Sequence, residues 1–191
     1  MLGIACFFVA VIISCNQAES HADSEVAAIS QDSLIKRGNF LVSSMGCNDC
    51  HSPKVFGPNG PEPDTSRLLS GHPANAPLPK FDTSTLRSWV LFTPDLTAAV
   101  GPWGVSFAAN LTPDSSGIGA WTEAQFFRAI REGKSKGLEG NRMLLPPMPW
   151  FNYALLSDHD LRAIFTYLKS IKPVKNMVPL PIPPGSADRK G

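Results

Sequence analysis

The chain has 191 residues, of which 43% are hydrophobic and 17% are charged, a balance that fits a folded protein and argues against intrinsic disorder. The formal net charge is only +1, so the basic excess typical of nucleic-acid-binding proteins is absent and we expect no nucleic-acid partner. The 15 glycines and 18 prolines predict long irregular segments between a few helices.

The chain begins with an apolar run. Residues 1–14, MLGIACFFVAVIIS, are too few to span a bilayer comfortably and are typical of the hydrophobic part of a secretion signal. The run leads into IISC, which resembles the bacterial lipobox, and this resemblance implies cleavage before Cys15 and lipidation of its thiol. An uncleaved apolar anchor and a plain signal peptide are the alternatives, and all three export the protein. We therefore expect an extracytoplasmic protein on the periplasmic side, held at a membrane by a lipid anchor.

A helix is expected early in the mature chain. Residues 15–30 are mostly polar and small, and we expect them to form a lipidated tether. The first helix is predicted from about Asp32 to Met45, because apolar residues recur there at helical spacing. This helix leads the chain directly into a cluster of cysteine and histidine residues.

The middle of the chain gives a weaker signal. Residues 53–110 contain many of the prolines and glycines and show no long periodic segment, so we expect a loop insertion. Within it, the stretches RSWVLF and VSFAANL predict at most a small hairpin. A loop region of this length inside a compact domain is usually functional or wrapped around something.

Two further helices are predicted in the second half. In WTEAQFFRAIREG, Thr122 is a good N-cap residue and Gln125 completes a capping box. The segment SDHDLRAIFTYLKSIKP carries an apolar stripe, begins with Ser157 and is stopped by Pro173. Between these helices lies MLLPPMPWFNY, an apolar loop stiffened by prolines. Residues 174–191 are expected to form a Pro-rich, loosely held tail.

The segment GCNDCHSPK contains Cys47, Cys50 and His51 within five positions. Cys-x-x-Cys-His is the attachment signature of c-type haem, in which each thiol adds across one vinyl group and the histidine ligates iron. A thioredoxin-like redox pair would need a βαβ context, whereas a helix precedes this motif. A zinc site would need four ligands, and the sequence has no second Cys/His pair at suitable spacing. The sequence therefore predicts one covalently bound haem c held by these three residues.

These segments together resemble the class I cytochromes c of the bacterial, membrane-associated kind, and especially the single-haem domains found beside periplasmic dehydrogenases. The resemblance rests on IKRGNFLVSSMGCNDCHSPK, NLTPDSSGIGAWTEAQFFRAIREG and LPPMPWFNYALLSDHDLRAIFTYLKS, and it covers residues 31–173. It implies an all-α, cytochrome c-like fold around one haem, with the first and last helices crossing and Gly38 paired with Tyr167. It also implies a methionine thioether as the second axial ligand, donated from the loop before the last helix.

Two methionines lie in that loop. Met148 is the expected ligand, because the prolines on both sides of it fix the backbone and remove local freedom. Met143 follows the flexible polar stretch KSKGLEGNR, so we expect it only to support the pocket wall. His72 and His159 are expected to be surface residues and not ligands.

These residues predict an electron carrier and not an enzyme. His/Met ligation fills both axial positions, so the expected reaction is outer-sphere electron transfer between a dehydrogenase or quinol-oxidising complex and an oxidase. The alternative is a haem protein with an open sixth position, peroxidase-like or binding a small ligand. A lipoprotein that uses haem only to stabilise its fold is a third class. The expected organisation is a signal peptide (1–14), a lipidated tether (15–30), a cytochrome c domain (31–173) that includes the loop insertion (53–110), and a tail (174–191).

Overall fold

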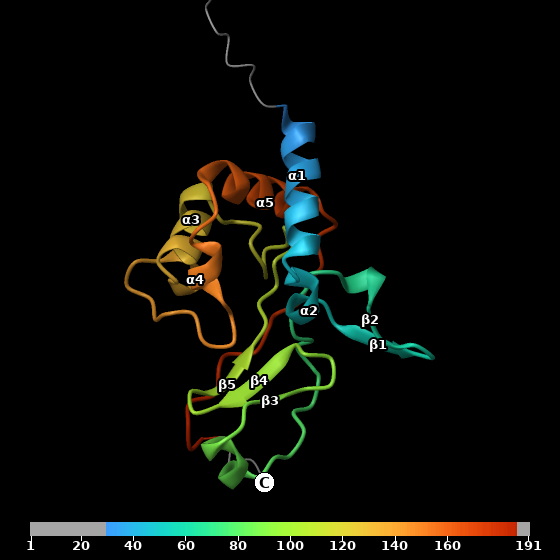
Figure 1. The fold of residues 1–191 in the computed structure, drawn as a ribbon, viewed down its shortest axis with the longest axis vertical. Coiled ribbons are helices and arrows are strands. Elements are labelled where there is room, and N and C mark those ends of the chain that lie inside the picture. The colour runs from blue at the N-terminus through green and yellow to red at the C-terminus, as the bar shows by residue number, and fades with distance from the viewer. Residues whose placement is uncertain (1–29, 187–191) are drawn as a thin grey trace, which may run out of the picture.

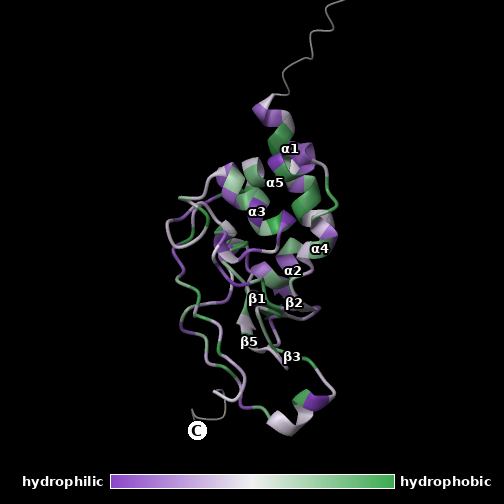
Figure 2. Cartoon of the chain, turned by 90° about the vertical axis from the view of Figure 1, so that its left-hand side faces the viewer, coloured by the Kyte–Doolittle hydropathy of each residue, from purple (hydrophilic) through white to green (hydrophobic). Residues whose placement is uncertain are grey.

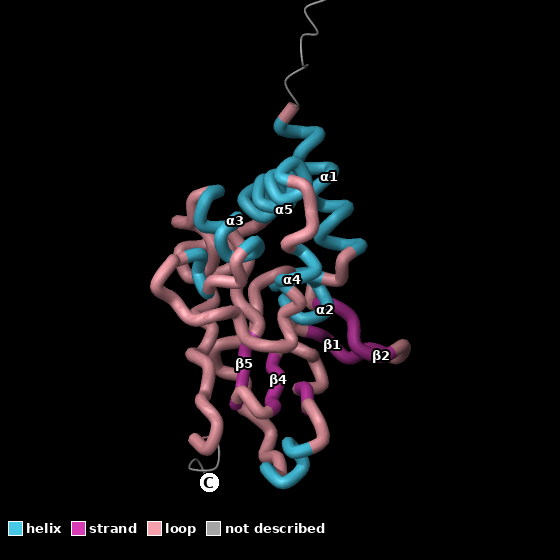
Figure 3. Tube along the Cα trace, turned by 60° about the vertical axis from the view of Figure 1, so that its left-hand side comes forward, coloured by secondary structure: helices cyan, strands magenta, loops and turns pink. Residues whose placement is uncertain are grey.

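The protein is described by a computed structural model that covers residues 30–186, so the predicted signal peptide, Cys15 and most of the tether lie outside the described residues. The α-helices gather at one end of the molecule and most of the strands at the other, as Figure 1 and Figure 3 show. None of the helices between residues 30 and 186 is long and apolar enough to span a bilayer. The α-helices are α1 (Gln31–Ser44), α2 (Cys47–His51), α3 (Glu123–Arg131), α4 (Trp150–Tyr153) and α5 (Asp158–Ser170).

The prediction of an all-α fold is wrong, because two small antiparallel sheets form within residues 53–110. The first sheet is a hairpin of β1 (Lys54–Gly57) and β2 (Gly60–Pro63), which projects from the side of the molecule in Figure 1. The second sheet contains β3 (Leu91–Phe92), β4 (Ala98–Gly101) and β5 (Gly104–Phe107) in that order. The remaining short elements are 3-10 helices, namely η1 (Thr65–Arg67), η2 (Thr83–Arg87) and η3 (Ser135–Gly137).

The sheets were missed because their strands are short and, in β4, buried along the whole length. β4 is buried along its whole length and carries only small or aliphatic residues, so it lacks the alternation by which a strand is recognised. The hairpin expected between RSWVLF and VSFAANL is only partly right. Both stretches do contribute strands, β3 and β5, but β4 lies between them and pairs with each.

The crossing of α1 and α5 at Gly38 is confirmed. A Cβ atom on Gly38 would lie against the backbone carbonyl of Ala163 and 2.6 Å from the Cβ of Tyr167. The Arg37 guanidinium donates a hydrogen bond of 2.9 Å to the Asp160 carboxylate, which joins the same two helices. A glycine is therefore needed at this position so that the two backbones can approach.

The main core lies among α1, α3 and α5, and the helices in Figure 2 carry both hydrophobic and hydrophilic residues, as expected for helices that bury one face. The capping box of Thr122 and Gln125 is confirmed at the start of α3, and Ser157 caps α5 as predicted. The buried members of this core are Leu41, Val42, Leu69, Ile118, Phe126, Ile130, Leu161, Ile164 and Leu168.

The segment after α5 is held by hydrogen bonds, so the prediction of a loosely held tail is wrong for residues 174–186. The Asn110 amide donates to the carbonyl of Val174 at 2.8 Å. The Asn176 amide donates in turn to the carbonyl of Ser70 at 2.7 Å. Two asparagine side chains therefore fasten the tail to the loops that follow the first sheet and the second sheet.

The tail also extends the second sheet. Ile182 pairs with Val105 of β5 in an antiparallel bridge, and the two N–H···O hydrogen bonds measure 2.8 and 3.0 Å. The sequence shows no strand pattern here, because a single bridge between prolines produces no alternation. The tail thus connects the sheet end of the molecule to the helical end.

Candidate haem site

Helix α2 contains both candidate thiols and the candidate imidazole. The chain turns from α1 into α2 at Gly46, whose φ of +72° lies in the left-handed region that favours glycine. Cys47 and Cys50 are three positions apart on this helix and therefore share one face. Both cysteines are free and partly exposed, and His51 follows them directly. This arrangement suits two bonds to one edge of a planar macrocycle.

The thiols are in a setting that keeps them protonated. Burial raises the pKa of the Cys47 thiol to about 11. Burial and, to a smaller extent, the nearby Asp49 carboxylate also raise the pKa of the Cys50 thiol. Redox-active Cys-x-x-Cys pairs depend instead on a lowered thiol pKa. The electrostatics of α2 therefore argue against the redox-pair alternative.

The imidazole of His51 has a fixed orientation. Its Nδ1 lies 2.7 Å from the backbone carbonyl oxygen of Ala109. Because a carbonyl oxygen can only accept, we infer that Nδ1 carries the proton and that Nε2 keeps a free lone pair. Burial lowers the pKa of His51, although the bond to Ala109 opposes this shift. A neutral imidazole with a bare Nε2 is the form that ligates a metal.

The structure distinguishes the two candidate methionines. Met148 is half-buried and packs against the main core. Met143 is 42% exposed and pairs with Lys134 in an isolated bridge. The loop that carries Met148 is tied to β5, since the Ser106 hydroxyl donates to the carbonyl of Pro146 at 2.6 Å. Met148 is therefore the more buried of the two candidate methionines.

Cys47 and Met148 both belong to a set of partly buried residues that pack against the main core. The phenol of Tyr153 donates to the carbonyl of Met45 at 3.1 Å, which joins α4 to the end of α1 just before the cysteines. The protonated thiols, the bare imidazole nitrogen and the soft thioether are the donor set of a covalent haem, so the residues fit this group. The other partly buried hydrophobic residues of this set are Met45, Leu111, Trp121, Phe127, Tyr153, Leu156, Phe165, Tyr167 and Ile171.

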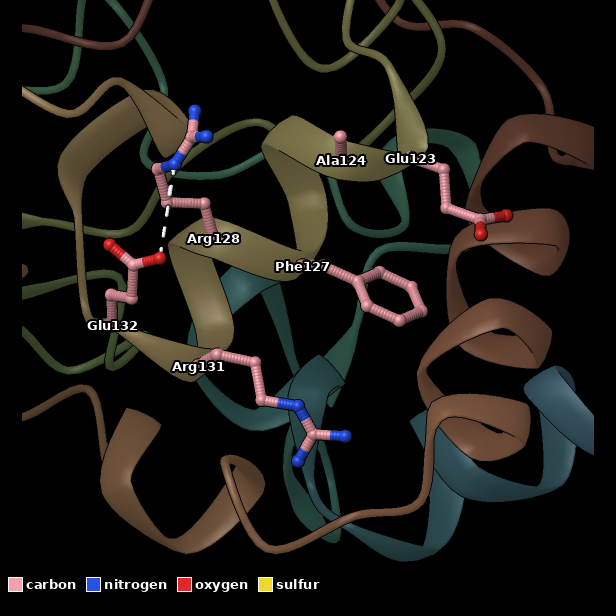
Figure 4. Close-up of a pocket in the computed structure, with 6 residues that line it drawn as sticks. All are labelled: Glu123, Ala124, Phe127, Arg128, Arg131 and Glu132. Atoms are coloured by element: carbon pink, nitrogen blue, oxygen red, sulfur yellow. Dashed lines mark ion pairs between the residues drawn. The ribbon is translucent and has the colours of Figure 1, made fainter.

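A separate groove of about 410 Å³ runs along α3 and contains none of the candidate ligands (Figure 4). Two of its charged side chains pair with α5, since Arg131 lies 2.6 Å from Asp158 and Glu123 lies 3.1 Å from Arg162. Arg128 and Glu132 pair with each other along α3 at 3.9 Å, as the dashed line in Figure 4 shows. The charged lining of this groove is therefore already ion-paired, and the groove contains none of the candidate haem ligands. Its lining residues are Glu123, Ala124, Phe127, Arg128, Arg131 and Glu132.

Sequence reasoning missed the carbonyl of Ala109, because a backbone acceptor leaves no signal in the sequence. The prediction for His72 is wrong, since this residue is 1% exposed and its Nδ1 lies 2.7 Å from the hydroxyl of Thr97. That hydroxyl donates to the Asp95 carboxylate at 2.8 Å, so a polar chain holds the buried ring. His159 is at the surface, as predicted, with 44% of its side chain exposed.

Comparison with known proteins supports the cytochrome interpretation. The chain is 29% identical over 147 residues to a subunit of the nicotinate dehydrogenase of Pseudomonas putida, covering 76% of this chain and 9% of that protein. It is 29% identical over 145 residues to the gluconate 2-dehydrogenase cytochrome c subunit of Pantoea cypripedii, covering 75% of this chain and 24% of that protein. It is also 29% identical over 153 residues to the alcohol dehydrogenase (quinone) cytochrome c subunit of Gluconobacter oxydans, covering 78% of this chain and again 24% of that protein.

No protein-family model matches the chain. The chain spans about a quarter or less of the length of these three relatives. Two of the three relatives carry the name of a cytochrome c subunit, so the similarity is to the electron-transfer part of a dehydrogenase and not to its catalytic part. The resemblance that the sequence motifs indicate, to c-type cytochrome domains associated with dehydrogenases, is therefore confirmed.

Proposed function

We propose that the protein is an electron carrier with one haem c, bound covalently through Cys47 and Cys50 and ligated by His51 and Met148. The observation that carries this proposal is the hydrogen bond from His51 Nδ1 to the Ala109 carbonyl at 2.7 Å, which leaves Nε2 free to bind iron. The similarity to cytochrome c subunits supports electron transfer by a cytochrome. The number of haems, the axial ligands and the membrane tether belong to the proposal alone.

The residues of the site have separate roles. Cys47 and Cys50 would hold the haem through two thioether bonds, and the addition of a thiol across a vinyl group needs no oxidant. The bond to Ala109 orients the imidazole, and the Met148 thioether would supply the second iron ligand from a half-buried position. Haem, when bound, supplies the one-electron redox chemistry. If His51 and Met148 both ligate the iron, oxygen or peroxide would find no open coordination position.

The proposed partner is a dehydrogenase. The relatives are named as subunits of nicotinate, gluconate and alcohol dehydrogenases, so we propose that this chain accepts electrons from such an enzyme and passes them to a further carrier or oxidase. We also propose that the protein acts on the extracytoplasmic, periplasmic side and is held at a membrane through lipidated Cys15. Residues 16–30 would then connect the anchor to α1.

The sixth ligand is tested with a matched pair of variants, Met148→Ala and Met143→Ala, each purified with haem attached. Met148→Ala should lose the near-infrared band of the thioether–iron bond, bind carbon monoxide when reduced, and have a lower reduction potential. Met143→Ala should keep the band and the wild-type potential, because this side chain is half-exposed and lies outside the core.

The outcomes separate the competing functions. If the two variants exchange behaviour, the sixth ligand is Met143. If the reduced wild-type protein binds carbon monoxide rapidly, the protein has an open sixth position and is not a simple electron carrier. If the wild-type polypeptide carries no haem on a denaturing gel, whereas a bacterial c-type control expressed alongside it does, the proposal of covalent haem is wrong.

A further inference from the structure

At the C-terminal end of α2, one backbone carbonyl lacks the N–H donor that a following residue normally provides. A helix leaves the carbonyls of its last turn without N–H partners unless residues beyond it supply them. The Asp49 carbonyl would normally accept from the N–H of residue 53, but this residue is a proline and has no N–H. The Asn48 and His51 carbonyls do find backbone donors, in Ser52 at 3.2 Å and Gly71 at 2.7 Å. The Asp49 carbonyl thus needs a donor from elsewhere.

The side chain of Lys54 supplies this donor. Its Nζ donates to the Asp49 carbonyl at 2.9 Å, to the Asn48 carbonyl at 3.1 Å and to the Ser52 carbonyl at 2.6 Å. The ammonium group therefore uses its donors on the last turn of the helix that carries His51. A cation at a helix C-terminus is also favoured by the negative end of the helix dipole.

Lys54 also lies within electrostatic range of the candidate ligands. Its Nζ lies 2.9 Å from the carbonyl oxygen of Asp49, directly before Cys50, and 2.6 Å from that of Ser52, directly after His51. Burial lowers the pKa of Lys54 itself, while the Asp95 and Asp49 carboxylates oppose that change. A positive charge held near a metal centre disfavours the more oxidised, more positive state of the metal. The position of Lys54 thus links the geometry of α2 to the redox equilibrium.

We propose that Lys54 is a positioning residue for the haem site, which fixes the C-terminal turn of α2 and His51 through three carbonyl contacts and raises the reduction potential through its charge. This inference rests on the proposed function and adds to it a residue outside the Cys-x-x-Cys-His signature. Pro53 and Lys54 then act together, because Pro53 has no backbone N–H for the Asp49 carbonyl and the Lys54 ammonium donates to that carbonyl instead.

The test compares Lys54→Met, Lys54→Arg and the control Lys172→Met in the full-length, haem-loaded protein. Methionine keeps an unbranched stem but removes the charge and the donors, whereas arginine keeps both. Lys172 is exposed, lies beyond the end of α5 and makes none of the carbonyl contacts of Lys54, so its replacement removes one charge and leaves those contacts in place. The readouts are the reduction potential by spectroelectrochemistry, the NMR shifts of the axial histidine, and haem stain per polypeptide.

We expect Lys54→Met to lower the ferrous-to-ferric ratio at a fixed ambient potential by about tenfold, which equals about 59 mV for a one-electron couple. The histidine shifts should move, and haem stain per polypeptide should fall. Lys54→Arg should restore all three readouts, and Lys172→Met should match the wild type. The proposal is overturned if Lys54→Met matches the wild type in potential and histidine shifts, or if Lys54→Arg is as defective as Lys54→Met.

The same experiments distinguish a failure of the proposed function from a failure of the role of Lys54. Wild-type protein without covalent haem would contradict the proposed function, whatever the variants do. Haem-loaded wild-type protein with an unaltered Lys54→Met variant would contradict only the role of Lys54. If Lys54→Met attaches too little haem for a potential to be measured, the comparison of haem stain with Lys54→Arg decides, because the proposal requires the arginine variant to recover it.

Discussion

The helix crossing at Gly38 allows a quantitative prediction. In Gly38→Ala the new Cβ would lie 2.6 Å from the Cβ of Tyr167 and against the Ala163 carbonyl, so α1 and α5 must separate by about 1 Å to reach normal contact. Neither contact can relax by rotating a flexible side chain, which favours the upper end of the overpacking range, about 3 kcal/mol. Alanine recovers about 1 kcal/mol through its higher helix propensity. The net loss should be about 2 kcal/mol.

This loss should lower the melting temperature by about 4–8 °C for a domain of this size. Far-UV circular dichroism of the purified protein, followed through thermal and denaturant unfolding, measures both quantities. The matched control is Gly140→Ala, because a Cβ at Gly140 meets no atom within 4 Å and the change should stay within about 0.5 kcal/mol. A Gly38→Ala protein as stable as the control would refute the argument that the close approach of the two backbones requires glycine.

Four further predictions follow from the charges, the anchor and the tail. Cys15→Ser should release the protein from membranes or block its processing while haem attachment survives, because the variant lacks the multiply acylated cysteine that stable anchoring needs. A Cys15→Ser protein that still fractionates with membranes at its mature size would contradict this. The hydrogen bond from Arg37 holds the pKa of the Asp160 carboxyl below its usual range, so the stabilisation is present above about pH 4 and is lost as the pH falls through the folded-state pKa. Asp160→Asn should therefore be less stable than the wild type at pH 7, with the two unfolding curves converging in acid; a gap that persists there would count against the pair. Asn176→Ala should cost about 1–3 kcal/mol, because it leaves backbone groups of the loops without a partner, and hydrogen exchange should rise first in the tail. Electron exchange with a natural partner should slow only mildly between low and physiological salt, because the net charge is +1; a fall of several orders of magnitude would disprove it.

The sequence predicts the three long helices well, because the first shows apolar residues at helical spacing and the other two have a recognisable start. Thr122 and Gln125 form the expected capping box, and Ser157 caps the last helix. The Gly38 crossing is also predicted correctly, but only through the family resemblance. Periodicity alone does not reveal which glycine faces another helix.

The sheets and the tail are not predictable in the same way. β1 and β2 consist of four residues each and contain prolines and glycines, which are poor strand formers. The tail is fixed by asparagine side chains that bind backbone carbonyls far away in sequence, and no local pattern encodes such contacts. The chemistry-bearing residues of the candidate site are visible in the sequence, whereas their supports, the Ala109 carbonyl and the Lys54 ammonium, depend on tertiary structure.

The fastening of the tail has a consequence for the order of events during biosynthesis. The ribosome makes the motif of α2 early, but the carbonyl that orients His51 belongs to Ala109, and the next residue, Asn110, is held by the carbonyl of Val174. At synthesis rates of about 5–20 residues per second, several seconds separate the two ends of this arrangement. A nascent or truncated chain can therefore display both cysteines before its histidine is properly oriented. On the proposed function, synthesis past Val174, and not the appearance of the motif, is then the step that completes the support of His51.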